Sequence, residues 1–239
     1  MPLLLAHQSP TMGIWKITEP WQDMLELFEN KAVYAEEIRQ IQSDKRKQEW
    51  LAVRLLLKHL VGTELTVGYR ENGTPFLINS PYHVSISHTK GYAAVILNRD
   101  AYPGIDIEYR SERAWKLRQR FMDEKELNML ASLNDNSLPA NDRLSRQITL
   151  ADRLSRQITL ATVCWCAKET AFKALRETEV DFINHLHITP FALSEKGSFL
   201  LTETKTPDPK TFLIHYQVTE DYVLTMINEK NEAFVQINS

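Results

Sequence analysis

The sequence lacks the features that mark several classes of protein. Its 239 residues include only two cysteines, Cys164 and Cys166, and one intervening residue is too short a spacing for ordinary disulfide geometry. No further Cys or His ligands accompany them at zinc-site spacing, so we expect both to be reduced thiols. No stretch approaches about 18 consecutive apolar residues, and no basic segment precedes the apolar run of residues 3–5. We therefore expect a cytoplasmic protein without a membrane-spanning segment.

The sequence also lacks a strong charge of one sign. Lys and Arg number 28 against 31 Asp and Glu, which gives a formal net charge of −3. No global positive field favours nucleic acid or an anionic membrane, so we expect neither as a partner. The hydrophobic and charged fractions, 43% and 25%, are those of an ordinary globular protein. The length fits one large domain or two closely packed halves.

Helices and antiparallel strands are both expected in the first part of the chain. Helical periodicity runs through residues 21–60 and stops at Gly62. After a turn at residues 72–75, two strand-like runs follow at 82–87 and 92–97, which indicate a hairpin.

A polar segment, residues 98–103, precedes a new strand at 104–108, and we place a boundary there. The expected halves are residues 1–102 and 103–239. In the second half, Asp123 and Glu126 have capping-box spacing at a helix start. Strand-like runs at 211–218 and 222–227 end the pattern. The expected fold class is α+β.

One decapeptide occurs twice in tandem. The sequence DRLSRQITLA fills residues 142–151 and is repeated without change at 152–161. Ten residues leave two copies in one straight helix about 80° out of phase, so they cannot present the same face. We expect the first copy to be displaced, as a loop or an extra helical stretch.

Acidic residues alternate with isoleucines in the strand Gly104-Ile105-Asp106-Ile107-Glu108. Asp106 and Glu108 therefore share one face of the strand and could hold a cation such as Mg²⁺. A half-buried strand with a solvated acidic face is the alternative. Glu126 could supply a third carboxylate, although its alternative role as a helix-capping residue is the commoner one.

A second group of charged residues lies on one expected helix. Trp165, Glu169 and Lys173 are spaced i, i+4, i+8, and Lys168 is next to this face. Two lysines could clamp a diphosphate while the glutamate accepts a proton from a hydroxyl. An ordinary surface ion pair, worth about 0.3 to 0.5 kcal/mol, is the alternative.

Two further segments could bind an anion. Ser87 and His88 end a strand at a turn, and Lys45 and Arg46 stand at the head of an amphipathic helix. A turn-stabilising pair and a solvated helix face are the alternatives, and no glycine-rich phosphate loop is present.

Taken in order, these motifs resemble the 4'-phosphopantetheinyl transferase superfamily, specifically its Sfp-type, enterobactin-synthase-like branch. The resemblance covers roughly residues 45–175. It rests on Gly104-Ile105-Asp106, on the set Trp165, Lys168, Glu169 and Lys173, on Ser87-His88, and on the run from Lys45 to Arg54. It implies two pseudo-equivalent α/β halves, with coenzyme A bound between them.

The resemblance also implies the roles of individual residues. Asp106, Glu108 and Glu126 would hold Mg²⁺, and Glu169 would activate the serine of an acyl or peptidyl carrier protein. Lys168 and Lys173 would grip phosphates, with Lys168 also acting in catalysis. Coenzyme A would contact Ser87 and His88 through its 3'-phosphate, with Lys45 or Arg46 nearby. The implied products are holo carrier protein and adenosine 3',5'-bisphosphate. We expect the enzyme to act as a monomer.

Two other functions stay open at this point. The same carboxylates and lysines would serve a different Mg²⁺- and nucleotide-dependent enzyme, or the chain could be a non-catalytic homologue that binds coenzyme A or a carrier protein. The turn residue Thr74 stands where many relatives have a basic residue, so one expected phosphate contact is absent or is supplied from elsewhere. An intact set of metal-binding and Lys-Glu motifs favours the enzyme, because a binder needs no base beside two lysines.

Overall fold

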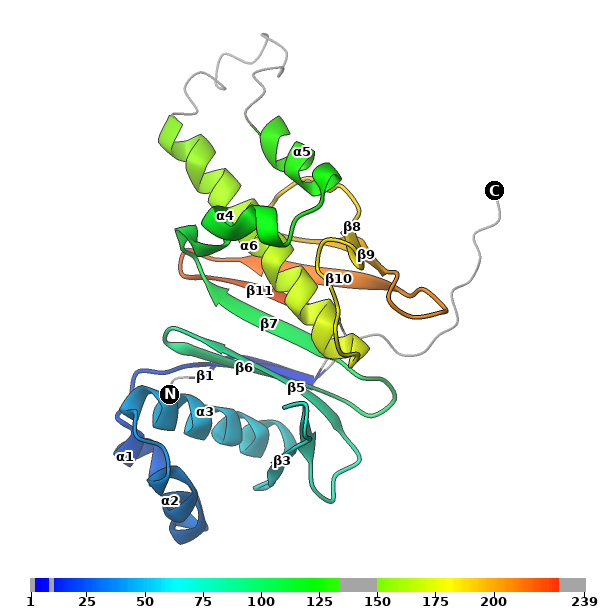
Figure 1. The fold of residues 1–239 in the computed structure, drawn as a ribbon. Helices are drawn as coiled ribbons and strands as arrows, with labels where there is room; N and C mark the ends of the chain where they lie inside the picture. Colours follow the sequence, from blue (N-terminus) through cyan, green and yellow to red (C-terminus); the bar gives the residue numbers. More distant parts are fainter. Residues whose placement is uncertain (1–2, 9–10, 134–149, 228–239) are drawn as a thin grey trace. The chain divides into compact units, whose positions relative to one another are not determined.

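The computed structural model describes residues 3–8, 11–133 and 150–227 (Figure 1). It contains helices and largely antiparallel strands, which confirms the α+β class. Contacts within the chain define two compact units. The first comprises the described residues up to Ile107, together with Lys173–Arg176 and Ile227, and the second comprises the described residues of Glu108–Phe172 and Glu177–Met226. The division expected at residue 102 stays a prediction.

The first unit is built on a four-stranded sheet of order β1-β2-β6-β5. Its strands are β1 (Leu3–Gln8), β2 (Thr11–Lys16), β5 (His83–Thr89) and β6 (Tyr92–Asn98), and each neighbouring pair is antiparallel. A short antiparallel pair, β3 (Val67–Tyr69) and β4 (Pro75–Leu77), flanks the expected turn at residues 72–75. The β5–β6 hairpin confirms the strand prediction, with ends shifted by one or two residues.

Helices α1 (Trp21–Leu25), α2 (Lys31–Arg39) and α3 (Asp44–Val61) fill the region where helical periodicity was found. Helix α3 lies along β2 and β6 (Figure 1) and buries Leu51, Leu55 and Leu56 in the core of this unit. The side chain of Ser43 caps its N-terminus by accepting from the Arg46 amide. Gly62 ends it at φ 82°, a conformation that favours glycine.

A further sheet, most of whose residues belong to the second unit, has the order β7-β11-β10-β9-β8. The strands are β7 (Gly104–Tyr109), β8 (Leu186–Ile188), β9 (Lys196–Glu203), β10 (Thr211–Val218) and β11 (Tyr222–Ile227). Helices α4 (Glu112–Leu117), α5 (Glu124–Ser132) and α6 (Leu150–Leu175) and the 3₁₀ turn η1 (Arg118–Arg120) complete the elements. Helix α5 begins with the predicted capping box of Asp123 and Glu126. Helix α6 packs on β11, where the Thr170 and Thr225 hydroxyls lie 2.6 Å apart.

Helix α6 begins at the last two residues of the first copy of the tandem repeat. Its second copy, residues 152–161, is helical, whereas residues 142–149 of the first copy lie outside the described residues. Leu150 and Ala151, the last two residues of the first copy, are exposed, but Leu160 and Ala161 are buried. These equivalent positions therefore have opposite environments in one helix, as the phase difference predicts.

Helix α6 also carries both cysteines. Cys164 and Cys166 are buried free thiols, which confirms the expected reduced state. Burial raises the pKa of the Cys164 thiol, so this thiol is a poor nucleophile. Within the described ranges, no helix has the length and apolar character needed to cross a membrane.

Candidate functional site

Asp106 of β7 is held by side chains from two other segments of the chain. Its buried side chain accepts hydrogen bonds at Oδ1 from the Ser87 hydroxyl and the Lys173 ammonium group, each at 2.7 Å. The same lysine donates to the Ile105 carbonyl at 3.1 Å. Three segments distant in the sequence, β5, β7 and the end of α6, therefore meet at one carboxylate oxygen.

Serine side chains of β5 connect this strand to β7. The Ser85 hydroxyl accepts from the Ile105 amide at 3.1 Å, and the Ser87 hydroxyl accepts from the Ile107 amide at 3.3 Å while donating to Asp106. These contacts satisfy backbone amides that would otherwise be buried without partners. They also fix where the Asp106 side chain stands. Ser85 was not singled out in the sequence, because an alternating strand gives no signal for a cross-strand hydroxyl contact.

The second carboxylate oxygen of Asp106, Oδ2, is buried and has no hydrogen-bond partner among the described residues. A buried anionic oxygen without a partner is costly and is usually paired with a donor or a cation. A hard divalent cation such as Mg²⁺ prefers carboxylate oxygens and keeps several water or phosphate ligands. The side chains present at Asp106 therefore fit such an ion.

Around Glu49 of α3, three predicted anion-binding residues come together. Its carboxylate is 3.5 Å from Lys45 Nζ, 3.9 Å from Arg46 and 3.5 Å from His88 Nδ1. Glu49 is buried, whereas the side chains of Lys45 and Arg46 are about two-thirds exposed, at 65% and 67%. Glu49 was not predicted as a site residue from the sequence. Its spacing from Lys45 and Arg46, at i+4 and i+3, is the signal that indicates it.

Burial and nearby charges together shift the pKa of His88. Burial lowers the pKa of His88, and Glu49 opposes this shift by raising the pKa. Nearby positive charges lower it further, those of Arg46, Lys173 and Lys45. The imidazole is therefore mainly neutral near pH 7 in the absence of an anion. A bound phosphate would favour its protonated form.

Glu108 and Glu169 are half-buried acidic residues of the second unit. The Trp165 indole donates to Glu108 Oε1 at 3.3 Å, which orients this carboxylate toward helix α6. Glu169 follows Trp165 by four residues and so lies on the same face of α6. The Trp165 ring is itself held by an edge contact with Phe121, with centroids 5.1 Å apart.

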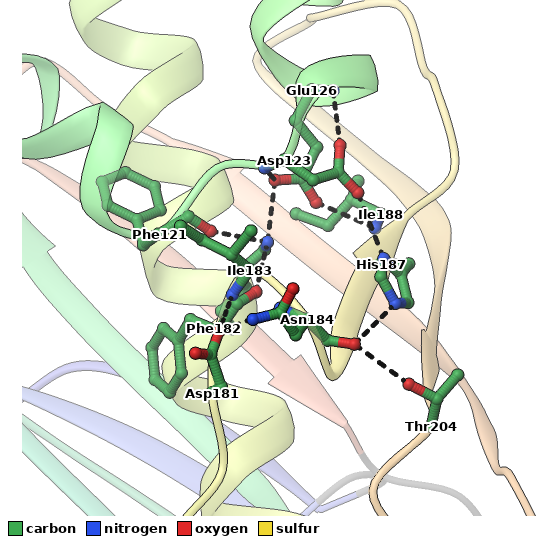
Figure 2. Close-up of polar contacts among 11 residues, drawn as sticks. Phe121, Asp123, Glu126, Asp181, Phe182, Ile183, Asn184, His187, Ile188 and Thr204 are labelled. Atoms are coloured by element: carbon green, nitrogen blue, oxygen red, sulfur yellow. Dashed lines mark hydrogen bonds and ion pairs between the residues drawn. The ribbon is translucent and has the colours of Figure 1, made fainter.

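Lys168 and Glu126 form a fully buried ion pair with an N–O distance of 2.7 Å. Lys168 also donates to the carbonyl oxygens of Phe121 and Phe182, at 2.7 and 2.8 Å. Its three ammonium donors are thereby used. Figure 2 shows this cluster of polar contacts between the start of α5, the segment before β8, and α6.

Glu126 has further partners on both of its oxygens. The carboxylate accepts from the Asp123 amide at 3.0 Å, as part of the capping box, and from the Ile188 amide at 3.0 Å. Asp123 in turn lies 3.1 Å from His187 Nδ1 (Figure 2). Burial raises the pKa of Glu126, while Lys168 and the backbone donors lower it. The carboxylate thus joins helix α5 to strand β8.

The structure brings six of the predicted site residues into two clusters. Ser87, Asp106 and Lys173 share one cluster, and Lys45, Arg46 and His88 share Glu49. No group of three or more His, Cys, Asp or Glu side chains in the described part of the chain is arranged to hold a metal. The predicted roles of Glu126 as a metal ligand and Lys168 as a phosphate ligand would require their ion pair to open.

The buried pair generates a prediction about stability. Lys168→Met should lower the free energy of unfolding by about 3 to 5 kcal/mol, because Glu126 is left as a buried charge without its cation. The loss should be smallest near the unfolded pKa of glutamate, about 4.3, and grow as pH rises, because the carboxyl whose folded pKa is raised must ionise in the folded state. Urea denaturation at several pH values measures both effects.

The matched control is the double variant Lys168→Met/Glu126→Gln. It removes both charges but keeps an acceptor for the backbone amides, so it should recover a substantial part of the loss and show less dependence on pH. Equal stability of the single variant and the parent protein would contradict a structural role for the pair.

Comparison with known proteins places this geometry in a family. No curated protein gives a significant match to the chain. A family model described as the 4'-phosphopantetheinyl transferase superfamily matches residues 102–227. The matched segment includes Asp106, Glu108, Glu126, the α6 residues discussed above, and the strands on which α6 packs. Because the match covers more than half of the chain, the protein belongs to the 4'-phosphopantetheinyl transferase superfamily and is a transferase.

Proposed function

We propose that the protein transfers the 4'-phosphopantetheine arm of coenzyme A to a serine of an apo acyl or peptidyl carrier protein. The observation that carries the proposal is Asp106, a buried carboxylate with one oxygen bound by Ser87 and Lys173 and the other without a partner among the described residues. This arrangement fits a site for a cation and an anionic diphosphate. Asp106 and Lys173 lie within the segment matched by the family model, and Ser87 precedes it.

Asp106 and Glu108 are the residues that we propose to hold Mg²⁺. They are two positions apart on β7 and therefore point to the same face of the strand. When bound, Mg²⁺ would neutralise negative charge on the diphosphate of coenzyme A. Glu126 was predicted as a third ligand, but it already has Lys168 and two backbone amides as partners. We therefore propose water and phosphate oxygens as the remaining ligands.

The chain itself supplies the contacts for the anionic parts of coenzyme A. Lys173, at the end of α6, places a cation beside Asp106, where it can bind a diphosphate oxygen. Lys45, Arg46 and His88 surround Glu49, and an arriving 3'-phosphate would be bound by these three groups. Glu49 keeps the cations close to one another before the phosphate binds.

We propose Glu169 as the base for the carrier serine. Its half-buried side chain lies on the α6 face that also carries Trp165 and Lys173. The serine oxygen forms a bond to the β-phosphorus of coenzyme A and its proton passes to Glu169. The phosphoanhydride bond breaks, and adenosine 3',5'-bisphosphate leaves with the released electron pair. Lys168 contributes by holding the second unit together rather than by contact with phosphate.

The first test is the intact mass of an apo acyl carrier protein and of an apo peptidyl carrier protein after incubation with the protein, coenzyme A and Mg²⁺. We expect a gain equal to phosphopantetheine, absent with EDTA and lost in Asp106→Asn. Asp100→Asn, which changes an exposed aspartate, is the control and should retain activity. Normal transfer by Asp106→Asn would contradict the assigned site. Coenzyme A binding without transfer to any carrier would favour a non-catalytic homologue.

A second test addresses the base. Glu169→Gln should reduce the transfer rate by about 10² to 10⁴, the range for loss of general base catalysis, and should leave the dissociation constant for coenzyme A nearly unchanged. Glu124→Gln, at an exposed position of α5, is the matched control. Single-turnover transfer rates and calorimetric binding measure the two quantities separately. A wild-type rate in Glu169→Gln would remove this residue from the mechanism.

A further inference from the structure

A cavity of about 190 Å³ lies in the first unit, at the start of β5. Arg70, Phe76, Tyr82, His83, Tyr102 and Arg176 contribute to its lining. None of the residues that line it is acidic. Its volume equals the liquid volume of about six water molecules, which is enough for a single ring with one charged substituent.

Two arginines of the lining lie over aromatic rings. The guanidinium of Arg176 lies 4.1 Å from the ring centroid of Tyr102, and that of Arg70 lies 5.6 Å from the ring centroid of Phe76. Neither forms an ion pair in the part of the chain that the structure describes. A guanidinium stacked through its face keeps the N–H groups of its edge available to a carboxylate or phosphate.

His83 adds a third polar group to this wall. Its ring lies 4.2 Å from the Tyr102 ring, centroid to centroid. Burial and the charge of Arg176 lower the pKa of His83, so the imidazole is mainly neutral near pH 7 and can donate or accept a hydrogen bond. Aromatic walls with a few convergent polar groups are typical of small-molecule sites.

The backbone of Arg176 provides a second, independent observation. Arg176 directly follows the last residue of α6 and has φ 59°, in the left-handed region that glycine normally occupies at a helix end. A residue with a side chain in this conformation is strained. This conformation belongs to the residue that places a cation at a cavity without acidic lining residues.

We propose that this cavity binds a small ligand in which an aromatic ring carries a carboxylate or a phosphate. The ring packs against Tyr102 and Phe76, and the oxyanion binds the edges of the Arg176 and Arg70 guanidiniums. Ser87 of the predicted 3'-phosphate site lies four residues along β5 from His83, about 13 Å at the rise of a strand. Competition with coenzyme A tests whether the two sites are separate.

The binding test uses the full-length protein with phenyl phosphate and benzoate as probes, observed by ligand-detected NMR titration. At least one of the two should bind, and comparison of the two distinguishes a phosphate from a carboxylate ligand. Benzyl alcohol, which has the ring without the charge, and inorganic phosphate, which has the charge without the ring, should bind about tenfold or more weakly. No binding by either aryl anion, or equal binding of inorganic phosphate, would overturn the proposal.

Arg176→Gly is the decisive variant, because glycine accepts the positive φ without strain and so should fold at least as stably as the parent. It should lose about tenfold or more in affinity for the probe that binds. Arg118→Ala is the control, since Arg118 also lies over an aromatic ring, that of Trp115, but neither residue lines the cavity. Unchanged affinity in Arg176→Gly, or an equal loss in Arg118→Ala, would refute the assignment.

A competition experiment separates this site from the transferase site. Saturating coenzyme A should leave the affinity for the aryl probe unchanged, whereas displacement of the probe would show that the two ligands share one site and would overturn a separate cavity. This measurement needs no carrier protein and no turnover. The outcome is therefore independent of whether the protein transfers phosphopantetheine.

Discussion

The hydrogen bonds to Oδ1 of Asp106 are the interaction on which the candidate site depends. A hydroxyl from β5 and an ammonium group from the end of α6 meet this oxygen, each at 2.7 Å. The neighbouring serine contacts tie β5 to the amides of β7, so the carboxylate cannot turn away without breaking several bonds. Its other oxygen is thereby held in place without a partner among the described residues, and this is the oxygen to which the proposed cation would bind.

A different kind of constraint operates in the second unit. Lys168 and Glu126 are buried together, and each has backbone partners from other segments. Such a pair contributes little net stability compared with apolar residues, but the loss of one member is severe. Lys168 therefore holds the buried face of α6 in place. Its neighbour Glu169 is only half-buried, as its proposed role as a base requires. Adjacent residues of one helix thus serve structure and proposed function separately.

Much of the fold follows from local sequence signals. Strands β10 and β11 have the predicted bounds, and the capping box at Asp123 and Glu126 forms as its spacing predicts. The same local signal did not reveal the partners of Lys168, because the Phe121 and Phe182 carbonyls and the Glu126 carboxylate come from distant segments. A lysine beside an exposed face is normally solvated, so its complete burial depends on tertiary structure that no helix periodicity encodes.

The central claim is that Asp106 holds a divalent cation against the diphosphate of coenzyme A. The most direct test uses Mn²⁺ as a paramagnetic probe and observes the ³¹P resonances of coenzyme A bound to the protein. The diphosphate resonances should broaden strongly with the parent protein and much less with Asp106→Asn at equal coenzyme A occupancy. Equal broadening with both proteins would contradict the account, because the cation would then be held without Asp106.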